Sequence, residues 1–263
     1  MKIKQEFEKY EGFILDLDGT TYRGSYIIPN ADKTINYIKR TGRKVIFVTN
    51  KTTDSAKDYF NFLTKNNLEI NENEILTATR VIKKYLTTNH PDFPIFALGE
   101  EKFISELRDA GLSFSCDPSK IKVVIVTLDR TLNYSRLEIA AKALEHGALF
   151  LAANIDDTCP VDEGEILDAG STISALEKRT HRKLEVHFGK PSKYMFEEAM
   201  SLIKKPAEKV LLIGDRIETD IRMGNTFGVD TALVRTGVFN DYPDNFSISP
   251  TYRLNSIADL TED

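Results

Sequence analysis

Two aspartates, Asp16 and Asp18, lie one residue apart and could together bind a ligand. They follow the apolar run Gly12 to Leu15 and are followed in turn by Gly19. A buried strand that stops in Asp-x-Asp-Gly delivers its acids to the carboxyl edge of a parallel sheet, where open α/β folds bind ligands. The simpler interpretation is a turn at Asp18-Gly19, with Asp16 closing the strand. Other polar groups in the chain bear on the choice between the two.

Three further groups of polar side chains also follow apolar runs. They are Thr49 with Asn50, Lys190, and Asp215 with Asp220 one helical turn further on. If the strands are parallel, all of these side chains lie at the same sheet edge as the first pair. Clustered carboxylates need a cation between them to stay ionised, and their hard oxygen ligands suit Mg²⁺ together with water and phosphate. A lysine, a hydroxyl and strand-end N–H groups would bind an anion beside that cation.

Strands and helices alternate along the chain, which predicts a parallel, doubly wound sheet. The predicted strands are 12–15, 44–49, 95–98, 122–127, 148–152, 184–187, 209–213 and 231–234. The predicted helices are 30–41, 54–66, 81–87, 100–110, 135–146, 171–178 and 192–203, with a further helix carrying Asp220. Ser135 is the expected cap of the helix that it begins.

The four polar groups all lie in the first and last thirds of the chain, so the middle third is expected to be a separate part. About 100 residues are enough for a small α/β domain with its own core. We therefore predict an α/β fold: a Rossmann-like parallel-sheet core formed by residues 1–80 and 183–263, interrupted by a smaller α/β cap domain formed by residues 81–182.

The composition excludes several classes of function. The net charge is -5 and the pI is near 5.6, which gives no support for nucleic-acid binding. No apolar run has the length of a membrane-spanning helix, and residues 1–11 lack an apolar secretion segment. Cys116 and Cys159 are too few for a disulfide framework or a metal cluster. We expect a cytoplasmic protein with reduced thiols.

Taken together, the four groups resemble the motifs of the haloacid dehalogenase (HAD) superfamily of phosphatases. In chain order they are Asp-Leu-Asp-Gly-Thr at 16–20, Val-Thr-Asn at 48–50, Gly-Lys-Pro at 189–191 and Gly-Asp-Arg-Ile-Glu-Thr-Asp at 214–220. The insertion between the second and third motifs is similar to the type IIA cap of the NagD-like and p-nitrophenylphosphatase-like branch. One such motif alone would be a weak signal, but four in order at the ends of predicted strands are a strong one.

The resemblance implies catalytic and metal-binding roles for three aspartates. Asp16 would be the nucleophile that forms an aspartyl-phosphate. Asp18 would be the general acid for the leaving alcohol and then the general base for the hydrolytic water. Asp16, the backbone carbonyl of Asp18, and Asp215 would hold Mg²⁺.

The same resemblance implies how the phosphoryl group is bound. Thr49, the backbone of Asn50 and the ammonium of Lys190 would contact the transferring phosphoryl oxygens. Asp220 would orient Lys190 or a metal-bound water rather than touch the metal. Each of these residues taken alone has a plainer interpretation, as a surface loop, a helix approach or the solvent face of a helix.

The function implied is a magnesium-dependent phosphatase that hydrolyses a small phosphorylated metabolite, a phosphomonoester, through an aspartyl-phosphate intermediate. Two alternatives stay open: a phosphosugar mutase, and a non-catalytic protein that binds a phosphorylated ligand as a sensor. The intact Asp16/Asp18 pair is an argument against the second. A homodimer formed through the cap is a further hypothesis, and neither nucleic acid nor a membrane is an expected partner.

Substrate specificity is expected to depend on residues where the chain departs from the family pattern or where the cap offers polar groups. Lys51 places a positive charge beside the predicted phosphate site, where the family often has asparagine. The loop Asn154 to Pro160 follows a predicted strand, and we expect it to face the core and to hydrogen-bond the organic part of the substrate through Asn154 and Asp156. Alternatively, these polar residues only solvate the outer surface of the cap.

Overall fold

The structure is a computed structural model that describes residues 1–161, 164–237 and 248–262. Contacts between Cα atoms divide the chain into two compact units. Unit 1 comprises Met1–Thr49, Ala56–Leu76 and Lys190–Asp263, and unit 2 comprises Asn50–Ser55 and Thr77–Gly189. The chain therefore passes repeatedly from one unit to the other, and each unit has its own sheet.

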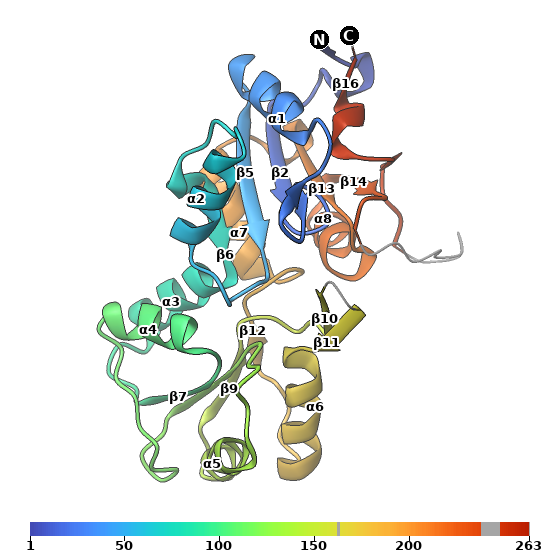
Figure 1. Cartoon of the computed structure of the whole chain (residues 1–263). Helices are drawn as coiled ribbons and strands as arrows, with labels where there is room; N and C mark the ends of the chain where they lie inside the picture. Colours follow the sequence, from blue (N-terminus) through green and yellow to red (C-terminus); the bar gives the residue numbers. More distant parts are fainter. Residues whose placement is uncertain (162–163, 238–247, 263) are drawn as a thin grey trace. The chain divides into compact units, whose positions relative to one another are not determined.

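Unit 1 is built on a six-stranded sheet with the strand order β15-β14-β13-β2-β5-β6 (Figure 1). The strands are β15 (Tyr252–Leu254), β14 (Asp230–Val234), β13 (Val210–Gly214), β2 (Gly12–Asp16), β5 (Lys44–Thr49) and β6 (Ile75–Thr77). Neighbouring strands pair in parallel from β15 through to β5. The carboxyl ends of β2, β5 and β13 consequently share one edge of this sheet.

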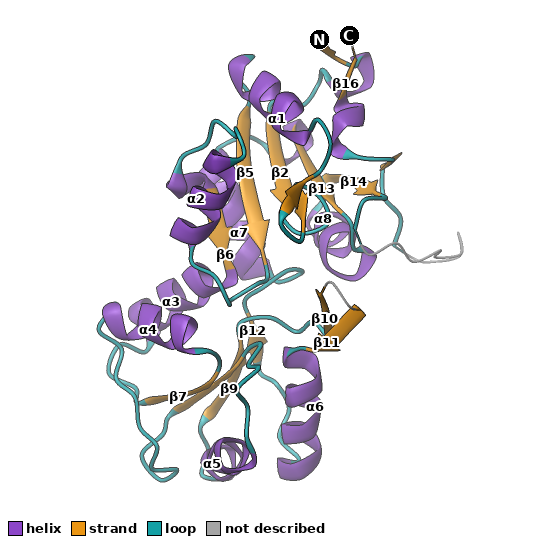
Figure 2. Cartoon of the chain, in the orientation of Figure 1, coloured by secondary structure: helices purple, strands orange, loops and turns teal. Residues whose placement is uncertain are grey.

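Helices cover both faces of the unit 1 sheet (Figures 1 and 2). They are α1 (Ala31–Arg40), α2 (Ala56–Lys65), α7 (Lys193–Ile203), α8 (Arg222–Phe227) and the π-helix Ile217–Ile221 that leads into α8. On one face, Phe13 and Leu15 pack in a single buried cluster with Ile35 and Ile38 of α1. On the other face, α7 approaches so closely that a Cβ at Gly12 would lie 2.7 Å from Ile203.

Short elements complete unit 1. They are the pair β1 (Lys2–Ile3) and β16 (Thr261–Glu262), the hairpin β3 (Tyr22–Arg23) and β4 (Tyr26–Ile27), and 3₁₀-helices at Gln5–Phe7, Glu72–Glu74, Ala207–Lys209 and Ile257–Leu260. Among the described residues, no helix combines the length and the apolar character needed to cross a membrane.

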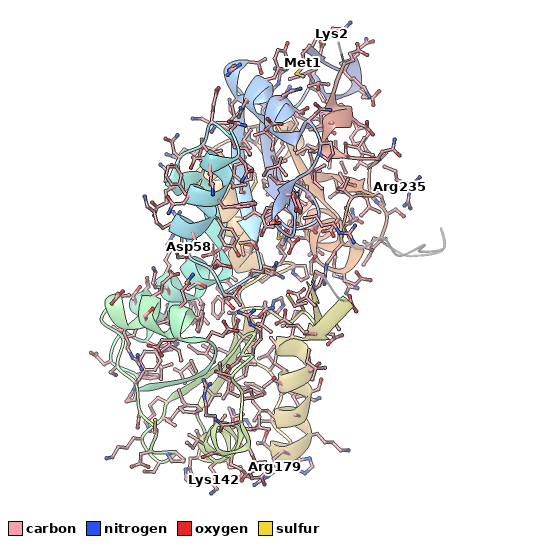
Figure 3. All side chains as sticks on the ribbon, viewed as in Figure 1. Met1, Lys2, Asp58, Lys142, Arg179 and Arg235 are labelled. Atoms are coloured by element: carbon pink, nitrogen blue, oxygen red, sulfur yellow. The ribbon has the colours of Figure 1, made fainter. Side chains whose placement is uncertain are left out.

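Unit 2 has a smaller parallel sheet with the strand order β12-β9-β8-β7. Its strands are β7 (Ile95–Leu98), β8 (Val123–Val126), β9 (Leu149–Ala152) and β12 (Val186–His187). Its helices are α3 (Ala78–Asn89), α4 (Glu101–Asp109), α5 (Tyr134–Glu145) and α6 (Ala169–Thr180), and it carries the hairpin β10 (Thr158–Val161) and β11 (Gly164–Leu167). Charged side chains such as Lys142 of α5 and Arg179 of α6 lie on its surface (Figure 3). Arg179 forms an ion pair with Glu145.

The predicted α/β class with parallel sheets is confirmed, and the differences are local. Helix α5 is capped by Asn133, whose Oδ1 accepts the Arg136 N–H at 3.0 Å, and not by Ser135. Helix α6 begins at Ala169, two residues before the predicted Ser171, because the Asp168 carboxylate accepts the Ala169 N–H. Strand β10 occupies part of the segment predicted as the loop Asn154 to Pro160, and its Pro160 hides the strand character of that segment.

Candidate active site

Asp16 is the last residue of β2 and lies at the carboxyl edge of the unit 1 sheet. The residue is 6% exposed, so its carboxylate has been almost fully removed from water. Behind it the chain turns sharply: the carbonyl of Leu17 accepts the N–H groups of Thr20, Thr21 and Tyr22, and the Thr21 hydroxyl donates to the carbonyl of Asp16 at 2.8 Å. The loop that follows the strand is therefore fixed by its own backbone.

Asp18 lies in this same loop and is more accessible than Asp16. The loop returns at once, because the N–H of Gly19 donates to the carbonyl of Tyr22 at 2.7 Å and the Thr236 hydroxyl donates to the carbonyl of Gly19 at 2.6 Å. Gly19 has a φ of +89°, a conformation that glycine adopts at little cost. The Asp-x-Asp-Gly sequence thus forms a tight loop that holds two carboxylates at different depths.

Lys190 bridges two of the buried carboxylates. Its Nζ donates to Asp16 Oδ1 and, at 2.7 Å, to Asp220 Oδ1, and the lysine itself is 3% exposed. Lys190 is the first residue of unit 1 after the chain leaves unit 2, whereas Asp220 lies on the π-helix after β13. One ammonium is therefore held between carboxylates from two different parts of unit 1.

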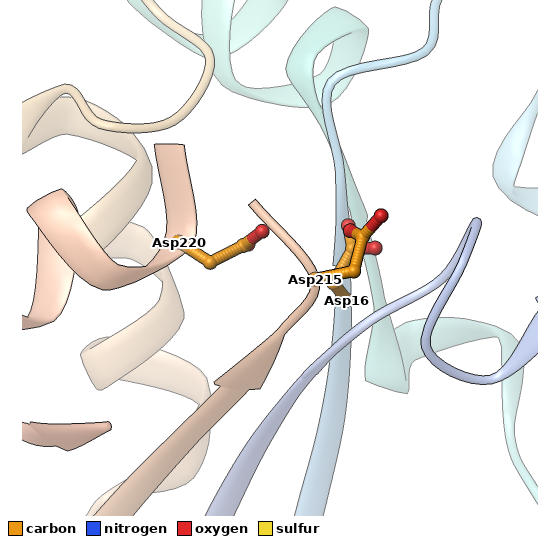
Figure 4. Close-up of side chains that lie close together, drawn as sticks. All are labelled: Asp16, Asp215 and Asp220. Carbon is orange, nitrogen blue, oxygen red and sulfur yellow. The ribbon is translucent and has the colours of Figure 1, made fainter. Parts of the chain in front are cut away.

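Asp215 follows β13 directly and completes a cluster of three carboxylates with Asp16 and Asp220 (Figure 4). One ligand oxygen from each residue lies within 4.8 Å of the others, and all three residues are buried. Two glycines make room for Asp215: a Cβ would lie 2.5 Å from its Oδ2 at Gly19 and 1.9 Å from it at Gly237. Any side chain at either position would displace the Asp215 carboxylate.

The electrostatics of the cluster reflect an excess of negative charge. Burial, and then the neighbouring carboxylates of Asp220 and Asp215, raise the pKa of Asp16 well above its usual value, and Lys190 opposes this only in part. Burial pulls the pKa of Lys190 down, but Asp16 and Asp220 outweigh it and raise that pKa above its usual value. Asp16 and Lys190 therefore each hold a proton more readily than the same group would in water.

The residues present fit a divalent cation. Three buried carboxylates face only one ammonium within the cluster, and their oxygens are the hard ligands that Mg²⁺ takes. The glycine-lined space around Asp215 leaves its carboxylate uncrowded by side-chain atoms at those two positions. The family resemblance implies that Asp16, Asp215 and the backbone carbonyl of Asp18 bind the metal. Lys190 contacts both Asp16 and Asp220, so its ammonium does not by itself distinguish the metal ligands.

The predicted phosphate-binding residues belong to both units of the chain. Thr49 ends β5 in unit 1 and is 2% exposed, and Lys190 also belongs to unit 1. Asn50 is the first residue of unit 2, where its side-chain amide donates to Asp156 Oδ2 at 2.9 Å.

The three residues predicted to govern specificity do not all line one cavity. Lys51 lines a cavity of about 600 Å³ in unit 2. Asn154 and Asp156 are instead joined by hydrogen bonds at the carboxyl edge of the unit 2 sheet, where Asn154 Nδ2 donates to Asp156 Oδ2 at 3.1 Å and to Asp168 Oδ1 at 3.1 Å. Asn154 is 2% exposed. These bonds give the two residues neighbours within unit 2, and substrate reading by them stays a prediction.

The cavity beside Lys51 contains charged residues that sequence reasoning missed. Arg130 forms a bidentate ion pair with Glu100, in which its Nε and Nη2 lie 2.5 Å and 2.9 Å from the two carboxylate oxygens. Lys102 donates to Asp54 at 3.1 Å. Burial is only partial here, and Arg130 keeps the pKa of Glu100 below its usual value through their hydrogen bond. Arg130 and Glu100 follow β8 and β7, so the rule of polar strand ends, applied to the second sheet, would have found them.

Two family models match different parts of the chain. Residues 13–113 match the model of the haloacid dehalogenase-like hydrolases, and residues 187–260 match a second, HAD-hydrolase-like model.

Curated relatives are similar over nearly the whole chain. The sugar-phosphatase AraL of Bacillus subtilis is 33% identical over 251 residues, which cover 95% of this chain and 92% of the relative. The 5'-nucleotidase YutF of the same organism is 28% identical, again with 95% of this chain covered and 97% of the relative.

Solved structures are similar in three dimensions. A p-nitrophenyl phosphatase from Archaeoglobus fulgidus has a TM-score of 0.89 at 32% identity, covering 95% of this chain and 98% of that one. A 4-nitrophenylphosphatase from Thermotoga maritima has a TM-score of 0.91 at 26% identity, covering 98% of each chain. NagD from E. coli has a TM-score of 0.85 at 25% identity, covering 95% of this chain and 97% of that one.

Proposed function

Because the chain belongs to the haloacid dehalogenase-like hydrolases, in their NagD-like branch, we propose that it hydrolyses small sugar phosphates with Mg²⁺ bound at Asp16 and Asp215. The same relationships make the chain a phosphoric monoester hydrolase of small phosphorylated substrates. The proposal of a sugar phosphate as substrate is supported by the similarity to AraL and to the acid sugar phosphatases of staphylococci, which are 28–29% identical. The observation that carries the residue roles is the buried cluster of three carboxylates around Lys190.

Asp16 is the proposed nucleophile. One of its carboxylate oxygens forms a bond to phosphorus while the bond from phosphorus to the leaving alcohol oxygen breaks, which gives an aspartyl-phosphate. The position of Asp16 at a strand end, tied through Lys190, supports this role, because a nucleophile has to be held in one orientation. Bound Mg²⁺ would neutralise charge on the phosphoryl group and on the clustered carboxylates.

Asp18 is the proposed acid and base. In the first step its carboxyl gives a proton to the leaving alcohol oxygen, and in the second its carboxylate takes a proton from the water that attacks phosphorus. That attack breaks the bond between Asp16 and phosphorus and releases inorganic phosphate. The tight loop around Gly19, with Asp18 more accessible than Asp16, supports this division of roles. The backbone carbonyl of Asp18 would be a third metal ligand.

Lys190, Thr49 and the backbone of Asn50 are the proposed contacts to the phosphoryl oxygens. Lys190 carries a fixed positive charge in a buried site, where such a charge stabilises an anion more strongly than in water. The contact at 2.7 Å between Lys190 and Asp220 supports the role of Asp220 as the residue that orients the lysine.

Selection among phosphate esters is proposed to involve Lys51. Its place in a charged cavity with Arg130 and Glu100 supports this, because such a cavity offers both donors and acceptors to the hydroxyl groups of a sugar. Asn154 and Asp156 remain predicted substrate-reading residues, and homodimer formation through unit 2 also remains a prediction.

The test is phosphate release from glucose 6-phosphate, AMP and p-nitrophenyl phosphate, each measured with Mg²⁺, with Ca²⁺ and with a chelator. We expect Mg²⁺ to support turnover and glucose 6-phosphate to exceed AMP in kcat/KM. Ca²⁺ should support little turnover, because its longer and more numerous bonds relax the in-line geometry.

Undiminished turnover in chelator would contradict the metal role. Faster hydrolysis of AMP would contradict the proposal that the substrate is a sugar phosphate. Binding of phosphate without release from any ester would indicate the sensing protein instead, and conversion of glucose 1-phosphate to glucose 6-phosphate would indicate a mutase.

A further inference from the structure

We infer that Asp156 is a positioning residue: through the side chain of Asn50 it holds the backbone that binds phosphate, and it therefore supports turnover of every ester to the same degree. This inference rests on the proposed function. It differs from the substrate-reading role that the sequence suggested for Asp156, because a positioning residue does not distinguish one leaving group from another.

The chain enters and leaves unit 2 beside two proposed phosphate contacts. Of the four places where the chain passes between the units, the first lies between Thr49 and Asn50 and the last between Gly189 and Lys190. These two are called here the first and the second crossing. Asn50 is bonded directly to Thr49, and Gly189 directly to Lys190. Contacts that fix Asn50 within unit 2 also restrict its backbone, which is itself one of the proposed phosphate contacts.

One carboxylate oxygen holds the first crossing. Asp156 Oδ2 accepts the side-chain amide of Asn50 at 2.9 Å and that of Asn154 at 3.1 Å. Asn154 is itself fixed: its amide also donates to Asp168, and its Oδ1 accepts the hydroxyl of Thr127 at 3.2 Å. The acceptor for Asn50 is thus prepared by a buried network, at small further cost in conformational entropy.

The second crossing packs against the first. A Cβ at Gly189 would lie 2.7 Å from Asn50 Oδ1 and 2.9 Å from the carbonyl oxygen of Ala153. The carbonyl of Gly189 also lies 3.3 Å from His187 Nδ1. Gly189 therefore leaves just enough room for the Asn50 amide, so that Asn50 is confined by Asp156 on one side and by Gly189 on the other.

The consequence is a substrate-independent effect on phosphate binding. If the Asp156 carboxylate is removed, the Asn50 amide loses the hydrogen bond to it, and the Asn50 backbone gains freedom that has to be lost again when phosphate binds. Removal of one partner of a charge-assisted hydrogen bond corresponds to roughly a tenfold to hundredfold change in an equilibrium. Inorganic phosphate, which has no leaving group, should be affected like the esters.

The experiment compares Asp156→Ala with Asp156→Asn on p-nitrophenyl phosphate and on glucose 6-phosphate, and measures inhibition by inorganic phosphate. Asp156→Ala is expected to lower kcat/KM for both esters by the same factor, about tenfold to a hundredfold, and to weaken phosphate inhibition. Asp156→Asn is expected to retain most of the activity, because one amide oxygen can still accept from both Asn50 and Asn154. Asp109→Ala, an exposed carboxylate on α4, is the control and should behave as wild type.

Gly189→Ala is a second variant that reaches Asn50 from the other side without changing any charge. It should reproduce the equal loss on both esters, which keeps the inference testable if Asp156→Ala does not fold. A much larger loss on glucose 6-phosphate than on the artificial ester would overturn the inference in favour of substrate reading. Wild-type activity in both Asp156→Ala and Gly189→Ala, or equal damage by Asp156→Asn and Asp156→Ala, would also overturn it. A wild-type protein that hydrolyses neither ester would instead refute the proposed function.

Discussion

Both sheets of this protein gather carboxylates at the carboxyl ends of parallel strands, but the groups that contact those carboxylates differ. In unit 1, the buried carboxylates of Asp16, Asp215 and Asp220 lie together, and the ammonium of Lys190 contacts those of Asp16 and Asp220. In unit 2, Asp156 and Asp168 both accept from the amide of Asn154, and so the carboxylates have neutral donors. The cluster of carboxylates at the first edge therefore favours binding of a cation. The two carboxylates at the second edge already accept hydrogen bonds from neutral groups of the protein. Parallel strand ends thus gather polar groups in both units, but the balance of charge decides which edge is suited to chemistry.

Asp16→Asn removes the nucleophile from the first edge and is the largest effect that we expect. An amide cannot attack phosphorus as an anion, so kcat should fall by roughly a thousandfold or more while the fold persists. Steady-state hydrolysis of p-nitrophenyl phosphate and a thermal unfolding curve are the measurements. The matched control is Asp92→Asn, at an exposed position in unit 2, which should leave kcat unchanged. Appreciable turnover by a folded Asp16→Asn protein would contradict the covalent mechanism.

Lys190→Ala tests whether the single ammonium is what sets the two edges apart. Its loss removes the ammonium from Asp16 and Asp220 and a cationic contact from the phosphoryl group, which should reduce transition-state stabilisation by about 2–4 kcal/mol. The measurement is kcat/KM, with exposed Lys193→Ala as the control three residues along the chain. If Lys190→Ala and Lys193→Ala have the same kcat/KM, Lys190 lies outside the reaction.

Gly237→Ala tests whether the space around Asp215 serves metal binding. The new Cβ would lie 1.9 Å from Asp215 Oδ2, so that the carboxylate has to move. A displacement of this size should raise the Mg²⁺ concentration needed for half-maximal activity on the order of tenfold or more. The titration is done at saturating substrate, and recovery of kcat at high Mg²⁺ is part of the expected result. An unshifted Mg²⁺ titration would mean that Asp215 does not bind the metal.

Thr127→Val acts on the second edge and should have the smallest effect on catalysis. Thr127 donates to Asn154 and lies 2.5 Å from the Thr52 hydroxyl, which must then be the donor in that pair. Valine removes both bonds and should lower the free energy of unfolding by about 1–3 kcal/mol. Chemical denaturation checks this, with exposed Thr88→Val as the control. A variant as stable as wild type would show that the hydroxyl network adds no net stability.

Several features followed from the sequence because they depend on local order. Apolar runs that end in polar residues identified β2, β5 and β13, and the alternation with helices indicated parallel strands. The parallel arrangement in turn implies that Asp16 and Asp215 lie at one edge, as they do. Capping was less predictable: Asn133 and Ser135 are both good caps, and only the path of the chain into α5 selects Asn133.

Tertiary structure alone decided the contacts between residues far apart in the chain. Lys190 lies 174 residues from Asp16 along the sequence, and its residue spacing does not predict their contact. The family resemblance, and not the spacing, suggested that Asp220 orients Lys190. Likewise Asn50 and Asp156 are 106 residues apart, and both can be interpreted as substrate contacts until their 2.9 Å hydrogen bond is seen. The physical reason is that strand ends determine which edge a polar side chain reaches, whereas its partner there depends on the packing of whole units.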